Sequence, residues 1–132
     1  MNRKAINDLL CLWGVRQPKD RILLMDAIHY YIYPERIDRQ PKAREIYAQI
    51  AEYSNSSVES IERRMQRILR TLGESEEPTV RALFDSMEKP TLAAVPFLRA
   101  FYEMYIMPGD LVRALWKVAD QAEKGQKKRA AR

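Results

Sequence analysis

The segment SSVESIERRMQRIL, residues 56–69, carries the strongest helical pattern of this chain. At 3.6 residues per turn, one side of the helix and of its continuation collects apolar residues, which are Val58, Ile61, Met65, Ile68, Leu69 and Leu72. Ser56 and Glu59 fit the S-x-x-E capping box, in which each side chain bonds the main chain of the other residue. The pattern predicts a helix that starts at Ser57 and runs to about residue 72.

The opposite side of this helix is polar and mostly basic. Ser60, Arg63, Arg67 and Arg70 point away from the apolar stripe, Glu62 and Gln66 lie along one edge of this outer face, and Arg64 lies along the other. Such a face is typical of a solvated surface helix, and Glu59 and Arg63 have the i, i+4 order that stabilises one. A carboxylate among arginines also suits base edges, since it accepts from cytosine N4 while arginine donates to guanine.

Apolar residues repeat with the helical period almost everywhere, and the sequence predicts an all-α bundle of about six helices. Gly73 is expected to cap the helix 57–72, and Pro78 to begin the next one. The other expected helices cover 6–13, ended by a left-handed Gly14; 20–33, ended by Pro34; a short helix from Ala43; 79–88; a helix from about Thr91 or Val95 to 106; and 110–124, capped by Asp110 after a turn at 107–110.

Composition indicates a single domain over residues 1–123 followed by a basic flexible tail over 124–132. A chain of 132 residues with 46% hydrophobic residues is long enough for one core. Five basic residues in the tail, Lys124, Lys127, Lys128, Arg129 and Arg132, equal the net charge of +5, which leaves residues 1–123 neutral. The sequence contains no membrane-length apolar run and no cleavable signal pattern, so we expect a cytoplasmic protein.

Catalytic and cofactor sites find little support in this composition. His29 is the only histidine and Cys11 the only cysteine, so neither a zinc site nor a cysteine–histidine pair can be assembled. Cys11 has apolar neighbours and is expected in the core. Four glycines do not form a phosphate-binding loop. We therefore expect no enzyme, no cofactor, no metal and no small-molecule substrate.

A short helix from Ala43, a polar turn and a helix with a basic outer face have the outline of a helix-turn-helix over about 43–72. In this motif the second helix lies in the major groove of double-stranded DNA. The helix 110–124 offers Leu111, Leu115, Trp116 and Ala119 along one side. This side could pack on the core of its own chain or form a homodimer, and packing on the core is the simpler expectation.

Several segments together resemble a known family. INDLLCLWGV, Lys19, LLMDAI, IYAQIA and SSVESIERRMQRIL are similar to the C-terminal DNA-binding effector domain of the sporulation initiation response regulator of endospore-forming bacteria. The resemblance extends to about Tyr105 and implies an all-α, roughly six-helix domain that binds duplex DNA, often as tandem copies. The family's full regulator has an N-terminal receiver domain, and we expect this chain to act without one.

The resemblance also implies roles for individual residues. Glu62 and Arg63 match the family's base-contacting pair, and Ser56 and Ser57 match residues that lie near phosphate. Ser60 and Gln66 stand where the family has arginine, Arg67 where it has histidine, Arg64 where it has alanine, and Asp20 where it has glycine. Because the inner stripe is kept and the outer face is changed, an alternative function remains, in which the chain is an interaction module that modulates a sporulation-type regulator without binding DNA.

Overall fold

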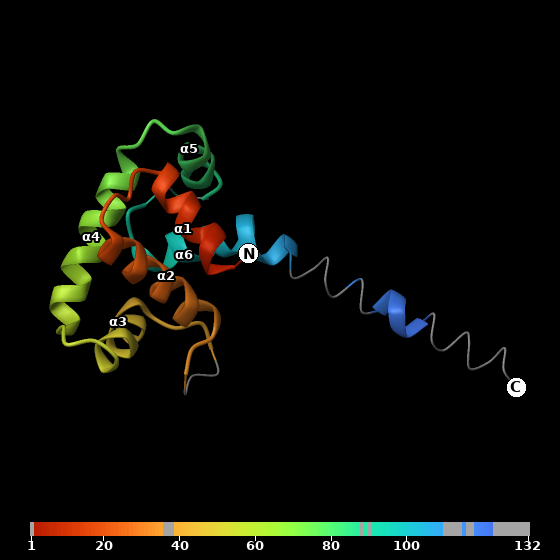
Figure 1. Ribbon diagram of the computed structural model, residues 1–132, viewed down its shortest axis with the longest axis horizontal. Coiled ribbons are helices and arrows are strands. Elements are labelled where there is room, and N and C mark those ends of the chain that lie inside the picture. The colour runs from red at the N-terminus through yellow and green to blue at the C-terminus, as the bar shows by residue number, and fades with distance from the viewer. Residues whose placement is uncertain are drawn as a thin grey trace, which may run out of the picture.

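The computed structural model describes residues 2–35, 39–87, 89, 91–109, 115 and 118–122, and the predicted all-α fold is confirmed (Figure 1). No strand occurs within these residues. Six α-helices and one π-helical segment follow one another: α1 (Arg3–Leu12), α2 (Pro18–Ile32), α3 (Ala43–Glu52), α4 (Val58–Gly73), α5 (Pro78–Asp85), α6 (Ala94–Phe101) and η1 (Tyr102–Ile106). No helix within the described ranges is both long enough and apolar enough to cross a bilayer.

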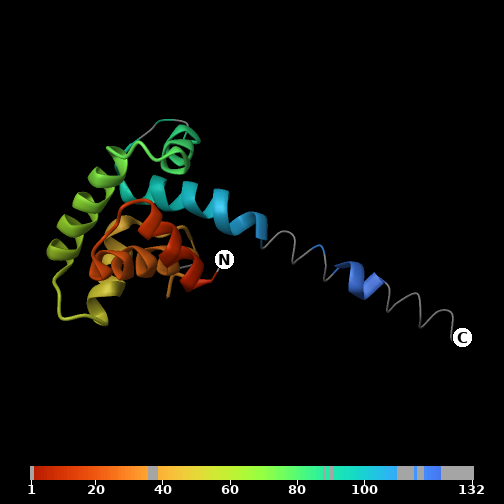
Figure 2. The ribbon, with the colours of Figure 1, turned by 45° about the horizontal axis from the view of Figure 1, so that its top comes forward.

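The helices α2 and α6 lie at the centre of the fold. Helix α2 contacts α1, α3, α4 and α6, whereas α4 contacts α2, α3, α5 and α6 from one edge of the molecule. Figures 1 and 2 show α4 along the side farthest from the N-terminus, with α5 at one of its ends and α3 at the other. One long face of α4 is therefore left uncovered.

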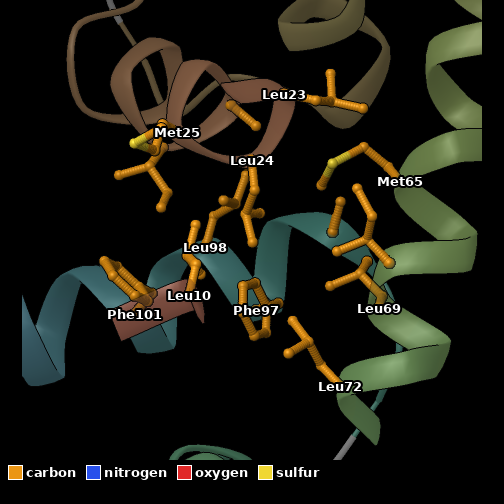
Figure 3. Close-up of a cluster of buried hydrophobic side chains, with 14 of the residues drawn as sticks. Leu10, Leu23, Leu24, Met25, Met65, Leu69, Leu72, Phe97, Leu98 and Phe101 are labelled. Atoms are coloured by element: carbon orange, nitrogen blue, oxygen red, sulfur yellow. The ribbon is translucent and has the colours of Figure 1, made fainter. Parts of the chain in front are cut away.

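All six α-helices contribute side chains to the core, and Figure 3 shows the part where α1, α2, α4 and α6 meet. Leu10, Leu24, Met65, Phe97 and Phe101 are all fully buried. Removing each such side chain from water stabilises the fold by roughly 1.5–3 kcal/mol. Because α4 contributes to this shared core, its orientation is fixed by packing along its whole length.

Most predicted helix ends are confirmed. Gly14 has φ +88°, the left-handed conformation that ends α1. Pro78 is the first residue of α5, and α6 starts at Ala94, beside the expected Val95. Helix α2 begins at Pro18, two residues before the predicted start, because proline fits the first helical turn.

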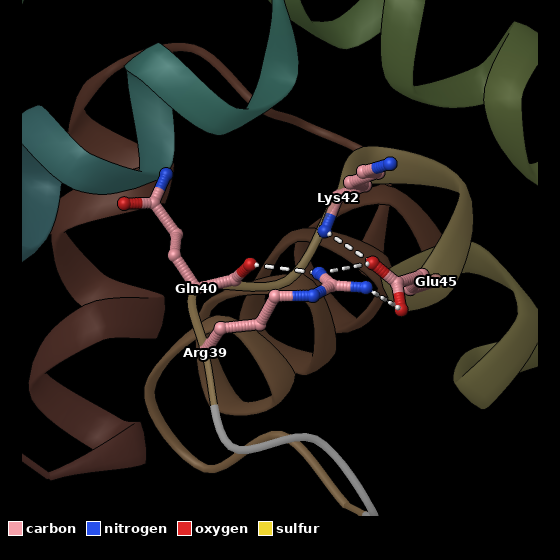
Figure 4. A network of polar contacts seen from close by, with 4 residues as sticks. All are labelled: Arg39, Gln40, Lys42 and Glu45. Carbon is pink, nitrogen blue, oxygen red and sulfur yellow. Dashed lines mark hydrogen bonds and ion pairs between the residues drawn. The ribbon is translucent and has the colours of Figure 1, made fainter.

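Helix α3 begins in a polar network that joins it to the preceding chain (Figure 4). Glu45 accepts a hydrogen bond from the main-chain N–H of Lys42 at 2.9 Å, which satisfies an amide at the helix start. The guanidinium of Arg39 donates to both carboxylate oxygens of Glu45, at 2.8 and 3.1 Å. This bidentate contact holds the pKa of Glu45 below its usual value and that of Arg39 above it.

Predictions for Cys11, for Gly73 and for the turn at 107–110 are wrong in the described residues. Cys11 is exposed, because it lies on the side of α1 opposite Ile6 and Leu10. Gly73 does not cap α4 from outside but is its last residue, where a Cβ would lie 2.6 Å from the Leu92 side chain. Residues 107–109 are helical and not a turn, since they continue the helix of η1.

The expectation that the helix 110–124 packs on the core of its own chain is contradicted where it can be checked. Leu115 and 118–122 are helical, and the Leu115 and Val118 side chains are 59% and 64% exposed. Ala119 is also exposed. Asp110, Leu111, Trp116 and the tail 124–132 lie outside the described residues.

Candidate nucleic-acid interface

The inner stripe of α4 is buried as the helical period predicts. Ile61, Met65, Ile68, Leu69 and Leu72 are inaccessible to water, and Val58 at the start of the helix is partly buried. Five buried residues over about three turns fix the rotation of α4 about its axis. The residues on its other side are therefore held outward.

Four residues form the exposed outer face of α4, and we call them the outer face from here on: Arg63, Gln66, Arg67 and Arg70. Arg63, Gln66 and Arg70 make no side-chain hydrogen bond or ion pair with any other residue that the structure describes. Their donors are turned to solvent. Three guanidinium groups along one helix make this face cationic, and each can donate to a phosphate or to a guanine edge.

Arg64 does not belong to this face. Its Nη2 donates to the main-chain oxygen of Lys19 at 3.1 Å and lies 3.6 Å from Oδ1 of Asp20. Its side chain is only 28% exposed. The arginine links α4 to the first turn of α2. Its role in DNA contact stays a prediction.

Arg67 belongs to the exposed outer face and also lies near Asp20. Its Nη2 is 3.5 Å from the same Asp20 oxygen, but 66% of the Arg67 side chain is exposed. The Asp20 side chain is only 15% exposed and faces both guanidinium groups. Asp20 thus offsets part of the positive charge along this edge of α4, and Arg67 can leave it without losing buried contacts.

Glu62 lies on the other edge of α4, where α3 packs. It is partly buried and stands close enough to Tyr47 of α3 to influence that residue electrostatically. Burial is the main cause that raises the pKa of Tyr47 to about 12, and the negative charge of Glu62 adds to it. Glu62 therefore flanks the outer face, as predicted, with part of its surface accessible.

The start of α4 differs in register from the prediction. The N-cap is Ser57, whose Oγ accepts a hydrogen bond from the N–H of Ser60 at 3.1 Å, so the capping box of Ser56 and Glu59 is wrong. Glu59 pairs with Arg44 of α3 at 3.5 Å. Ser56, Ser57 and Ser60 lie at the end of α4 that meets the turn 53–57. Ser56 and Ser60 are partly buried, and Ser57 is exposed.

Sequence reasoning missed the residues that surround α4 from the N-terminal half of the chain. Arg16, Gln17 and Asp20 line a hollow of about 190 Å³ together with Arg67 and Thr71. The signal of this neighbourhood in the sequence was Asp20, which stands where the resembled family has glycine. A separation of more than forty residues along the chain hides the contact from any local pattern.

The described residues contain no group of three or more histidine, cysteine or acidic side chains that could hold a metal ion. Comparisons with protein-family models, curated proteins and solved structures give no match for this chain. The interface is thus characterised by its own geometry and charge.

Proposed function

We propose that this chain is a sequence-specific regulator that binds double-stranded DNA, with α3 and α4 acting as a helix-turn-helix and α4 as the recognition helix. Helix α3 packs against α4 across the five-residue turn 53–57, and α4 presents one face along its length. In a helix-turn-helix the second helix enters the major groove, while the rest of the domain holds it against the backbone. The family resemblance of residues 56–69 supports the same role.

One observation carries this proposal: the long face of α4 that no other described residue covers is the cationic one. The outer face places the unpaired side chains of Arg63, Gln66 and Arg70 on the side opposite a completely buried stripe. An arginine can donate two hydrogen bonds to guanine, and a glutamine can form a bidentate pair with adenine. These residue types suit base edges as well as phosphates.

Selection of bound duplexes from a random pool, followed by titration of the selected site, tests the proposal. Arg63→Ala should reduce affinity for the selected site by roughly 1–3 kcal/mol if Arg63 reads a base. Lys4→Ala, on an exposed residue in the first turn of α1, serves as the charge-matched control. A wild-type chain that enriches no sequence and shifts no duplex at low salt would contradict the proposal.

The second candidate function is a protein-interaction module that modulates a sporulation-type regulator. The exposed apolar side chains of Leu115 and Val118 favour it, as they favour homodimerisation or tandem binding. Sedimentation of the free chain separates self-association from the binding of another protein. Leu115→Asp should then abolish association while leaving a monomer's affinity for duplex DNA unchanged.

A further inference from the structure

We propose that the corner between α1 and α2, residues 14–19, is a second DNA-contacting element, in which Arg16 and Lys19 bind backbone phosphates beside the recognition helix. We call it the α1–α2 corner. This inference rests on the proposed function and adds to it the residues that hold one DNA strand. Phosphate contacts of this kind position a protein on the duplex without reading its sequence.

The first argument is position. The α1–α2 corner lies along the edge of α4 that carries Arg64 and Arg67, because Arg64 donates to the carbonyl of Lys19. The hollow of about 190 Å³ lies between the corner and α4, and it is lined by Arg16 of the corner and by Arg67 of α4. A liquid water occupies about 30 Å³, so the hollow has room for a group several times larger.

The second argument is charge. Arg64 and Arg67 face the one carboxylate of Asp20, and the corner adds Arg16, Lys19 and the guanidinium of Arg21, which leaves a formal charge of +4 (five minus one) at this edge. Arg16 and Lys19 are exposed and pair with no acidic residue in the described ranges. Residues 1–123 are neutral overall, so this charge is a local concentration and does not reflect a basic domain.

The third argument is that the corner is rigid through its main chain. Arg21 Nη1 donates to the carbonyl oxygens of Val15 and Arg16 at 2.9 and 2.8 Å, while its Nε donates to Asn7 at 2.9 Å. Gly14 turns the chain with its positive φ. Because main-chain carbonyl groups make these bonds, the side chains of Arg16 and Lys19 remain available for phosphates. The loop that carries them is already ordered, so binding carries no entropy cost of ordering it.

The arrangement fits a helix lying in a major groove, which is bordered by the phosphates of both strands. With the outer face toward the bases, the Arg67 edge of α4 faces one of these borders, and the α1–α2 corner continues that edge away from the helix. The ligand is thus a phosphodiester of duplex DNA. Free inorganic phosphate shares its chemistry and is the alternative occupant.

The double variant Arg16→Ala/Lys19→Ala tests this inference in the full chain, with Lys4→Ala/Lys89→Ala as its control. All four residues are exposed, and the alanine variants keep the carbonyls that Arg21 and Arg64 bind. Each lost phosphate contact reduces the slope of log affinity against log salt by about 0.9. For the double variant the slope of log affinity against log salt should be smaller by about 1.8 in magnitude. The ratio of its affinities for selected and random duplexes should stay constant.

The opposite change gives an independent measurement. Gln17→Lys adds a cation to the same hollow, where Gln17 makes no capping bond to α2, and should steepen the salt slope by about 0.9. The inference is overturned if wild type binds duplex but Arg16→Ala/Lys19→Ala and Gln17→Lys match the control. It is also overturned if inorganic phosphate shifts the amide signals of the corner while duplex binding ignores all three substitutions, which would identify a small-anion site.

A wild-type chain that binds no duplex overturns both proposals. Retained duplex binding with unchanged slopes overturns only this one, so the two failures can be told apart. Circular dichroism melting of each variant shows whether the fold is intact before its slope is interpreted. A lost slope in an intact variant supports the inference.

Discussion

Replacing Asp20 by asparagine should lower the stability of the fold and strengthen DNA binding at the same time. Asp20 lies 3.6 Å from Arg64 and 3.5 Å from Arg67, and both distances are at the long end for an ion pair. The pair with Arg67 is mostly exposed and contributes under about 1 kcal/mol. The pair with Arg64 is more sheltered, but Arg64 keeps its hydrogen bond to the Lys19 carbonyl in the variant.

These terms add to a loss of about 1–2 kcal/mol in the free energy of unfolding, or roughly 3–10 °C in Tm for a chain of this size. The same substitution removes a negative charge from the edge of α4 that we propose faces DNA, and it releases Arg67. One more phosphate neutralised would steepen the slope of log affinity against log salt by about 0.9. Stability and affinity should therefore change in opposite directions.

Thermal unfolding by circular dichroism and duplex titration at several salt concentrations measure the two effects. Asp85→Asn, at an exposed position that ends α5, is the matched control and should leave both quantities nearly unchanged. If Asp20→Asn weakens DNA binding along with stability, the reasoning is refuted. Asp20 would then hold Arg67 in its binding position and not restrain it.

Two further predictions concern the opposite edge of α4. Glu62→Ala should relax discrimination at one base pair by roughly 1–3 kcal/mol, while affinity for random duplex holds or rises. Competition between the selected site and its single-base variants measures this effect. Uniformly tighter binding would identify Glu62 as ordinary surface charge. Burial raises the pKa of Tyr47 to about 12. The protonated Tyr47 therefore contributes fully to the free energy of unfolding below about pH 10, and this contribution is lost as the pH rises through about 12. Between pH 9 and 12, the free energy of unfolding measured in urea should fall by about 2–3 kcal/mol less for Tyr47→Phe than for wild type. An equal fall in the two proteins would contradict the raised pKa.

The fold could be predicted because its main signal is local. The burial of Ile61, Met65 and Leu72 follows from the helical period alone, since a helix with one apolar side has only one side to bury. The prediction that Cys11 is buried failed because it used only the apolar character of its neighbours in sequence. Its sequence neighbours Leu10 and Leu12 are apolar, but neighbours in sequence lie on different sides of a helix, and the period places Cys11 opposite Ile6.

The site was predicted only in part, because its decisive contacts join residues that are far apart in the sequence. Both Ser56 and Ser57 can cap a helix, and the choice between them depends on the whole packed arrangement, in which Glu59 pairs with Arg44 of α3. Arg64 belonged to the predicted reading surface from its position on the helix. Its contact with Asp20 depends on how α2 crosses α4, which no pattern within α4 records.

The distribution of charged and polar side chains on the accessible sides of α4 has a consequence for specificity. Arg63, Arg67 and Arg70 are alike in charge and can all be satisfied by phosphates, so they raise affinity for every duplex. Glu62 is repelled by phosphates, whereas Gln66 can donate to a phosphate but forms a bidentate pair only with an adenine edge. If α4 enters the major groove, discrimination between sequences depends on this non-cationic pair more than on the arginines around it. With Arg64 bound to α2 and Asp20, the proposal assigns the choice of sequence to one edge of the helix, where Glu62 and Gln66 lie about one turn apart.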